Sequence, residues 1–207
     1  MNGYPNFQQV LDGIGEKSSA AFVLSVKRAK ADLRTYRETF PQWVADASER
    51  GLANFIHDRL WAHLKSFADQ IPDMDIVEKG PTREITVGIS YRFRFKRHDE
   101  AGDIASYPTE SFLEFVAQPA EQQLPGMEET RLIAGYEWVK DRREIGGPVL
   151  SLRDGKDNII WNEPLPDVAD ADEAAPLVTP QRPAPVAPTV EIPDHIGQEH
   201  GEETDPA

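Results

Sequence analysis

The hydrophobic period changes near Pro72, and this change limits the choice of fold more than any other feature of the chain. Before Pro72, apolar residues recur every three to four positions, which is the spacing of amphipathic helices. After it, apolar and polar residues alternate, which is typical of strands with one buried face. Helices followed by strands predict an α+β domain whose helices pack on one face of an antiparallel sheet.

The helical part of the domain is expected over about residues 16–70. Ser18 or Ser19 would cap the first helix, and Phe40-Pro41 should end it because the residue before proline avoids the helical conformation. Its apolar stripe consists of Phe22, Val26, Ala29, Leu33 and Tyr36. This spacing predicts a helix with one buried side.

A second long helix is expected over about residues 52–68, with Pro72 stopping it. Its apolar stripe consists of Leu52, Ile56, Leu60, Leu64 and Phe67. A short helical piece through Trp43 and Val44 precedes it and is expected to stop at Gly51. Burial explains Trp43 in this scheme, whereas a tryptophan left exposed would indicate an interface.

The sheet part is expected over about residues 74–165, with about five antiparallel strands and one inserted short helix. The strands are predicted at residues 75–77, 83–96, 131–139, 149–153 and 159–162. Thr109 would cap the inserted helix, and Pro119 would close it. Helices and sheet together make a single domain, residues 1–165.

Residues 166–207 form a tail that composition separates from this domain. They contain eight of the chain's 17 prolines, no Phe, Trp or Tyr, and too little apolar mass to offset the entropy of ordering. We therefore predict a disordered, acidic, proline-rich tail. Ten acids against Arg182 alone give this tail a net charge of −9, which leaves −5 of the total −14 on the domain.

Composition also excludes several classes of protein. With no cysteine, the chain has no disulfides, thiol nucleophiles or thiolate metal sites. No apolar run approaches the roughly 18 residues needed to cross a bilayer, and the start lacks the basic and then apolar order of a signal peptide. We expect a soluble, cytoplasmic protein with no membrane partner, no cofactor and no metal.

Basic and aromatic residues interleave over residues 90–97, as they do where bases stack and phosphates are neutralised. Side chains alternate along a strand, so the aromatic rings would enter the core while Arg92, Arg94 and Lys96 share the other face. We expect a solvated cationic strand face formed by these three side chains. It is the candidate site for an anion or a partner, through either phosphates or carboxylates.

Asp141, Asp154 and Lys156 superficially match the two acids and lysine with which some nucleases hold a divalent cation. That chemistry requires the second acid and the lysine on a rigid strand. Asp154-Gly155, however, is the dipeptide that a tight hairpin turn favours. The turn is the preferred interpretation, and the metal site is the alternative.

The segment Gly13-Ile14-Gly15-Glu16-Lys17-Ser18-Ser19 has some features of a phosphate-binding loop. No strand precedes it, and Glu16 stands where the glycine before the lysine should be. An acid at that position would repel phosphate, so a loop that leads into a helix is the better interpretation.

Two functional hypotheses follow. The first is a non-enzymatic interaction or regulatory protein that acts through the cationic strand face and the flexible acidic tail, which would screen those cations until a partner displaces it. The expected partner is a protein, with nucleic acid as the other candidate. The second is a metal-dependent nucleic-acid-processing enzyme that uses Asp141, Asp154 and Lys156.

Overall fold

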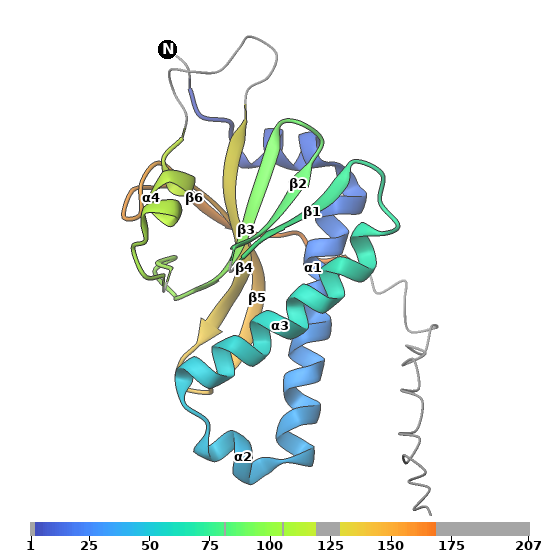
Figure 1. Ribbon diagram of the computed structural model, residues 1–207, viewed down its shortest axis with the longest axis vertical. Helices are drawn as coiled ribbons and strands as arrows, with labels where there is room; N and C mark the ends of the chain where they lie inside the picture. Colours follow the sequence, from blue (N-terminus) through green and yellow to red (C-terminus); the bar gives the residue numbers. More distant parts are fainter. Residues whose placement is uncertain (1–2, 81, 105, 119–128, 169–207) are drawn as a thin grey trace, which may run out of the picture. The chain divides into compact units, whose positions relative to one another are not determined.

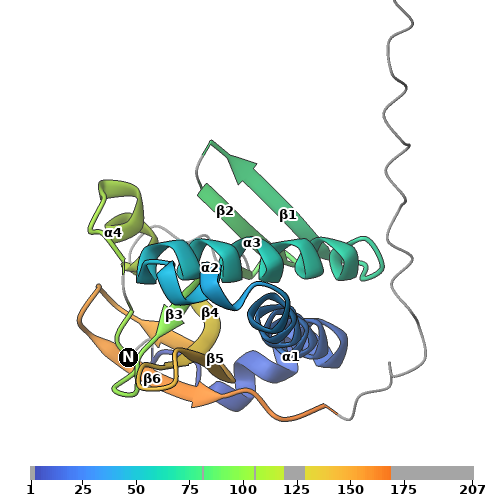
Figure 2. The same cartoon turned by 90° about the horizontal axis from the view of Figure 1, so that it is seen from below.

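The computed structural model describes residues 3–80, 82–104, 106–118 and 129–168 (Figures 1 and 2). These residues form helices and one six-stranded mixed sheet, so the protein belongs to the α+β class. They belong to one compact unit that spans Met1–Asp170. The predicted disordered tail lies outside the described residues, apart from its first three positions.

Helix α1 (Phe7–Thr39) begins well before the expected start, so the prediction that Ser18 or Ser19 caps it was wrong. Asn6 caps it instead through a capping box, in which its side chain accepts from the Gln9 N–H and the Gln9 side chain accepts from the Asn6 N–H. The helix continues past Gly15 by kinking there, with φ 76° and ψ 161°. Glycine permits this positive φ because it has no Cβ. Ser18 lies beyond the kink, inside the second helical segment, where it is buried.

Helices α2 (Pro41–Asp46) and α3 (Glu49–Ala68) follow α1. The Ser48 side chain accepts a hydrogen bond of 3.0 Å from the Gly51 N–H, so Ser48 is the N-cap of α3. Gly51 therefore lies in the first turn of α3 and does not end the piece before it. Helices α1 and α3 pack against one another, and both bury their apolar stripes.

The sheet has the strand order β1-β2-β3-β4-β5-β6, so every strand pairs with its neighbours in sequence. Its strands are β1 (Met74–Lys79), β2 (Thr82–Val87), β3 (Tyr91–His98), β4 (Thr130–Val139), β5 (Glu144–Arg153) and β6 (Ile159–Pro164). All neighbours are antiparallel except β3 and β4, which are parallel. The prediction of about five antiparallel strands was therefore incomplete.

The sixth strand arises because the expected strand over residues 83–96 is a hairpin. It turns at Gly88, whose φ is 58°, and Val87 pairs with Tyr91. Paired residues face the same side of a sheet, and these two positions are an even number apart. Apolar and polar residues therefore keep alternating through the turn, and the alternation cannot reveal it.

The parallel pair arises from the inserted helix, α4 (Glu110–Val116). A tight turn reverses the chain direction, whereas parallel strands need a crossover of a dozen or more residues. The connection between β3 and β4 contains α4 and is long enough to return the chain to the start of β3. Figure 1 shows α4 beside β6 and the strands of the sheet, on a different side from α3.

Both faces of the central strands are covered. On the first face, the ring of Phe22 from α1 meets those of Phe93 and Phe95, at centroid distances of 4.9 and 5.3 Å. On the second face, α4 builds a small apolar cluster of Ile104, Phe112, Phe115, Val116 and Ile133. Because side chains alternate between faces, this cluster lies on the side that carries Arg92, Arg94 and Lys96.

Gly135 permits the close approach of β3 and β4, since a Cβ at this position would overlap the carbonyl oxygen of Lys96. We expect Gly135→Ala to lower the free energy of unfolding by about 2 kcal/mol or more, as measured by denaturant titration. Gly147→Ala is the matched control, because no atom lies within 4 Å of the added Cβ. Equal stability of the two variants would contradict this account of the parallel pair.

Candidate functional site

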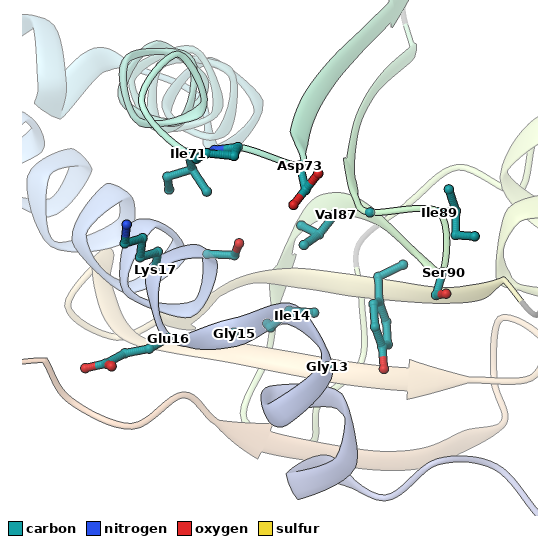
Figure 3. A pocket seen from close by; sticks show the side chains of 14 residues that line it. Gly13, Ile14, Gly15, Glu16, Lys17, Ile71, Asp73, Val87, Ile89 and Ser90 are labelled. Atoms are coloured by element: carbon teal, nitrogen blue, oxygen red, sulfur yellow. The ribbon is translucent and has the colours of Figure 1, made fainter.

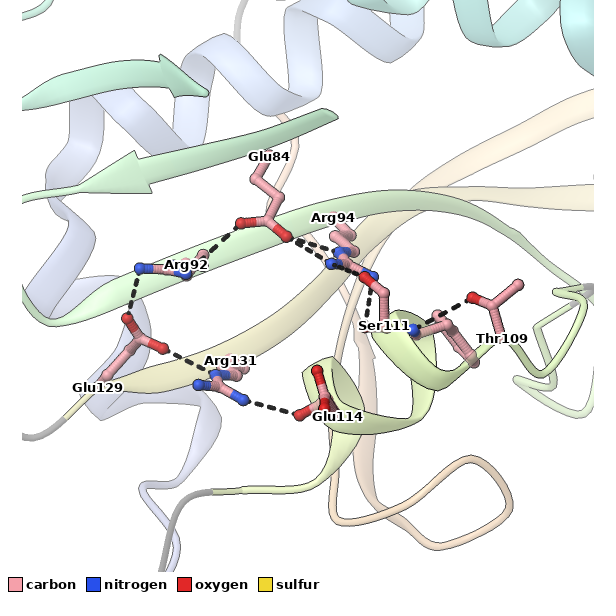
Figure 4. Close-up of polar contacts among 9 residues, drawn as sticks. Glu84, Arg92, Arg94, Thr109, Ser111, Glu114, Glu129 and Arg131 are labelled. Atoms are coloured by element: carbon pink, nitrogen blue, oxygen red, sulfur yellow. Dashed lines mark hydrogen bonds and ion pairs between the residues drawn. The ribbon is translucent and has the colours of Figure 1, made fainter. Parts of the chain in front are cut away.

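Arg94 lies beneath α4, and its guanidinium has partners within the domain (Figure 4). Its Nε and Nη2 donate to Glu84 Oε1 at 2.8 and 2.6 Å, and its Nη1 donates to the Ser111 carbonyl at 3.0 Å. The guanidinium carbon also lies 4.3 Å from the centroid of the Phe115 ring. Only 12% of the Arg94 side chain is exposed, so this cation joins β3 to β2 and α4.

Arg92 extends the same network toward β4. It lies 3.6 Å from Glu84 and 2.9 Å from Glu129, and Glu129 accepts a 2.7 Å hydrogen bond from Arg131 Nε. Arg131 in turn donates to the carbonyl of Glu114 in α4 at 2.7 Å. The arginines of the expected cationic strand face are thus partnered by acids and carbonyls of the domain.

Lys96 differs from these arginines. Its ammonium lies 5.5 Å from the centroid of the Phe112 ring, and it has no ion pair among the described residues. Burial lowers the pKa of Lys96, with a smaller contribution from nearby Arg94. Of the three predicted anion-binding residues, Lys96 is the one whose charge is not met by an acid in the described part of the chain.

We expect Arg94→Met to lower the free energy of unfolding by about 3 kcal/mol, because it leaves Glu84 charged in a buried setting. Lys65→Met is the control, since Lys65 and Glu78 form an ion pair with both side chains more than 40% exposed. That change should cost less than about 1 kcal/mol. If thermal unfolding shows equal losses, the role of Arg94 in the fold is contradicted.

The structure places Asp141 and Asp154 at opposite ends of β5. At about 3.3 Å per residue, the length of that strand puts roughly 30 Å between them, so they do not share an ion. Asp154 instead accepts hydrogen bonds from the Tyr4 hydroxyl and, at 3.2 Å, from the Gln118 N–H. Lys156 lies in the turn after β5, where its carbonyl accepts from Arg153. The described residues contain no cluster of three or more His, Asp or Glu side chains suited to a metal ion.

The segment Gly13–Ser18 lies at the kink of α1 and forms one wall of an open cavity of about 620 Å³ (Figure 3). The other walls are the α3–β1 connection at Asp73 and the β2–β3 turn at Ile89 and Ser90. Figure 3 shows Glu16 pointing away from Asp73 and Ile89. Acids and a single lysine line this cavity without converging on one point, so we assign it no ligand.

The corner between α1 and α2 exposes two aromatic rings. Trp43 is 62% exposed and Phe40 is 40% exposed. Their rings stack, with centroids 4.4 Å apart and planes 9° apart. The expected burial of Trp43 was wrong, because α2 is only six residues long and buries Val44 alone.

Arg143, in the turn between β4 and β5, holds this corner in place. Its Nη2 donates to the Ala47 carbonyl at 2.7 Å, and its Nε donates to Glu49 at 2.9 Å. Its own carbonyl accepts from Arg37 of α1. Arg143 has a φ of 53°, a costly conformation for a residue with a side chain, and these contacts to α1, α2 and α3 maintain it.

Cations lie along the last turns of α1, the helix that ends at this corner. Lys30, Arg34 and Arg37 recur at helical spacing and therefore share one side of α1. They line a groove of about 460 Å³ together with Glu38 and Glu144. Lys30 and Arg34 are exposed and form no ion pair within the described residues. We call Lys30, Arg34, Arg37, Phe40 and Trp43 the α1–α2 surface.

Comparison with known proteins adds no further constraint. No protein-family model matches this chain, and searches of curated proteins and of solved structures found no similar chain. Among the described residues, no helix has both the length and the apolar character needed to cross a membrane. The α1–α2 surface and the cavities of the domain are therefore the features from which a function can be inferred.

Proposed function

We propose that this protein is a non-enzymatic interaction protein that binds an acidic protein segment through the α1–α2 surface. The observation that carries the proposal is the exposed Trp43, stacked on Phe40 at a corner that Arg143 holds in place. Exposed aromatic rings on a rigid support are typical of the residues that dominate binding energy in protein interfaces.

Rigidity supports this role because a preorganised surface loses little entropy when it binds. Arg143 fixes the end of α2 through the Ala47 carbonyl and the start of α3 through Glu49. The two rings also stack on each other, which limits their rotation. A partner would therefore meet a preformed apolar platform.

The charges beside this platform indicate the chemistry of the partner. Lys30 and Arg34 would attract carboxylates, whereas Glu38 and Glu144 in the same groove would repel a continuous phosphate backbone. A protein segment carries discrete acids between apolar residues and can satisfy both conditions. A protein segment is therefore favoured over nucleic acid.

We expect Phe40→Ser combined with Trp43→Ser to weaken partner binding by about tenfold or more, because both rings leave the platform. The measurement is quantitative affinity capture from the native host with nuclease-treated lysate. Tyr107→Ser is the matched control, since Tyr107 is 84% exposed and lies on the β3–α4 connection. Binding that nuclease abolishes, or that the double variant leaves unchanged, would refute the proposal.

The regulatory half of the proposal concerns the residues after Val168 and rests on composition. They carry nine acids and one arginine, so they resemble the proposed partner in charge. Because they belong to the same chain, they would compete with that partner at a high effective concentration. Their target would be Lys30 and Arg34, since Arg92 and Arg94 already have acidic partners.

We expect truncation after Val168 to tighten binding of the captured partner and to make that binding more sensitive to salt, since the cations would no longer be screened. Titration calorimetry at two salt concentrations measures both effects. Replacing the nine acids after Val168 by their amides is the matched control for chain length and should act as the truncation does. Unchanged affinity in both variants would contradict the proposed competition, but it would not contradict binding at the α1–α2 surface.

A further inference from the structure

A second candidate site lies where β2 and β3 separate. The two strands pair only from Ile85 to Val87 on β2 and from Tyr91 to Phe93 on β3. Beyond Phe93, no described strand pairs with β3 on this side, while β4 continues to pair with it on the other. Residues of α3, β3 and β4 line a partly open cavity of about 190 Å³ next to this part of β3, which we call the α3–β3 cavity.

The α3–β3 cavity is lined by cations and neutral groups and by no acid. Its lining residues are Ala53, Asn54, His57, Leu60, Phe95, Lys96, Arg97 and Tyr136. Arg97 is balanced by Glu49 at 3.3 Å, and Arg83 beside His57 is balanced by Asp58 at 2.8 Å. Lys96 lines the cavity, although its ammonium also lies 5.5 Å from the Phe112 ring of α4, and it has no ion pair among the described residues. Its charge is felt in the cavity, because it contributes to lowering the pKa of His57.

The titratable groups around the cavity respond to that charge. Burial is the main reason that the pKa of His57 is lowered, and the nearby cations Arg83 and Lys96 lower it further, against a smaller opposing effect of Asp58. Burial likewise lowers the pKa of Lys96. The protonated forms of both side chains are therefore disfavoured by their surroundings, and a bound anion would favour them.

We propose that the α3–β3 cavity binds a small oxyanion, with Lys96 as its principal ligand and His57, Arg97 and Asn54 beside it. Its volume equals that of roughly six water molecules, at about 30 Å³ each, which suits an anion of a few heavy atoms. The neutral side chains can also contribute: Asn54 supplies an amide, and burial raises the pKa of Tyr136, which keeps its hydroxyl protonated as a hydrogen-bond donor.

This site is independent of the α1–α2 surface. Its residues come from α3, β3 and β4, and none of them belongs to the surface proposed for the partner protein. Failure to detect anion binding would therefore not contradict the proposed protein partner. Failure to detect that partner would not contradict anion binding. The sequence predicted Lys96, Arg92 and Arg94 as one anion-binding group. In the structure the two arginines form ion pairs with acids, whereas Lys96 forms none within the described residues.

The test uses the full chain and titrates sulfate or acetate against chloride at equal ionic strength, with His57 observed by NMR. Sulfate represents a tetrahedral oxyanion and acetate a planar carboxylate. We expect the wild-type protein to bind one of them with saturation, and the pKa of His57 to rise by about one unit when it does. Binding should tighten as the pH falls through the pKa of His57, because a protonated imidazole attracts the anion.

Lys96→Met should weaken this binding by about tenfold or more, since it removes a charge-assisted contact. Lys156→Met, in the turn after β5, is the matched control and should bind as the wild type does. If Lys96→Met fails to fold, His57→Gln provides the same comparison, with anion binding read from the Asn54 side-chain amide signals and expected to lose its pH dependence. Non-saturable shifts with both anions, or equal affinity in Lys96→Met and Lys156→Met, would overturn the proposal.

Discussion

The parallel pairing of β3 with β4 is the constraint on which the rest of this structure depends. It requires a crossover, and the crossover contains α4, which covers the second face of the sheet. Under α4, Arg94 meets Glu84 and the ring of Phe115. Cations that a simple antiparallel sheet would have left in solvent thus become part of the link between sheet and helix.

The same constraint decides which groups remain available for binding. Arg92 and Arg94 hold Glu84 of β2 and Glu129, which directly precedes β4, so they stabilise the fold. Lys96 lies beyond the point where β2 leaves β3 and has no acid beside it in the described chain. On the helical side, α2 is too short to bury Trp43 and leaves it exposed at the end of α1. Each proposed site therefore lies where the regular packing of the domain ends.

Much of the fold was predictable because periodicity reports which side of an element is buried. The stripes from Phe22 to Leu33 and from Leu52 to Leu64 are buried as expected. The hairpin at Gly88 was missed because Val87 and Tyr91 are paired at an even spacing, which preserves the alternation. The start of α1 was missed because the kink at Gly15 resembles an end in the sequence, although Asn6 and Gln9 carry a capping box.

The sequence by itself determined the class of fold, the buried apolar stripes, the lack of thiol chemistry and the clustering of acidic residues after residue 166. These properties follow from composition and from neighbours along the chain. Only the tertiary structure decided that Arg94 is paired while Lys96 is not, that Asp141 and Asp154 are far apart, and that Trp43 is exposed. The reason is physical: the state of a charge or a ring depends on groups brought to it by strand order and crossover, and those groups are distant in sequence.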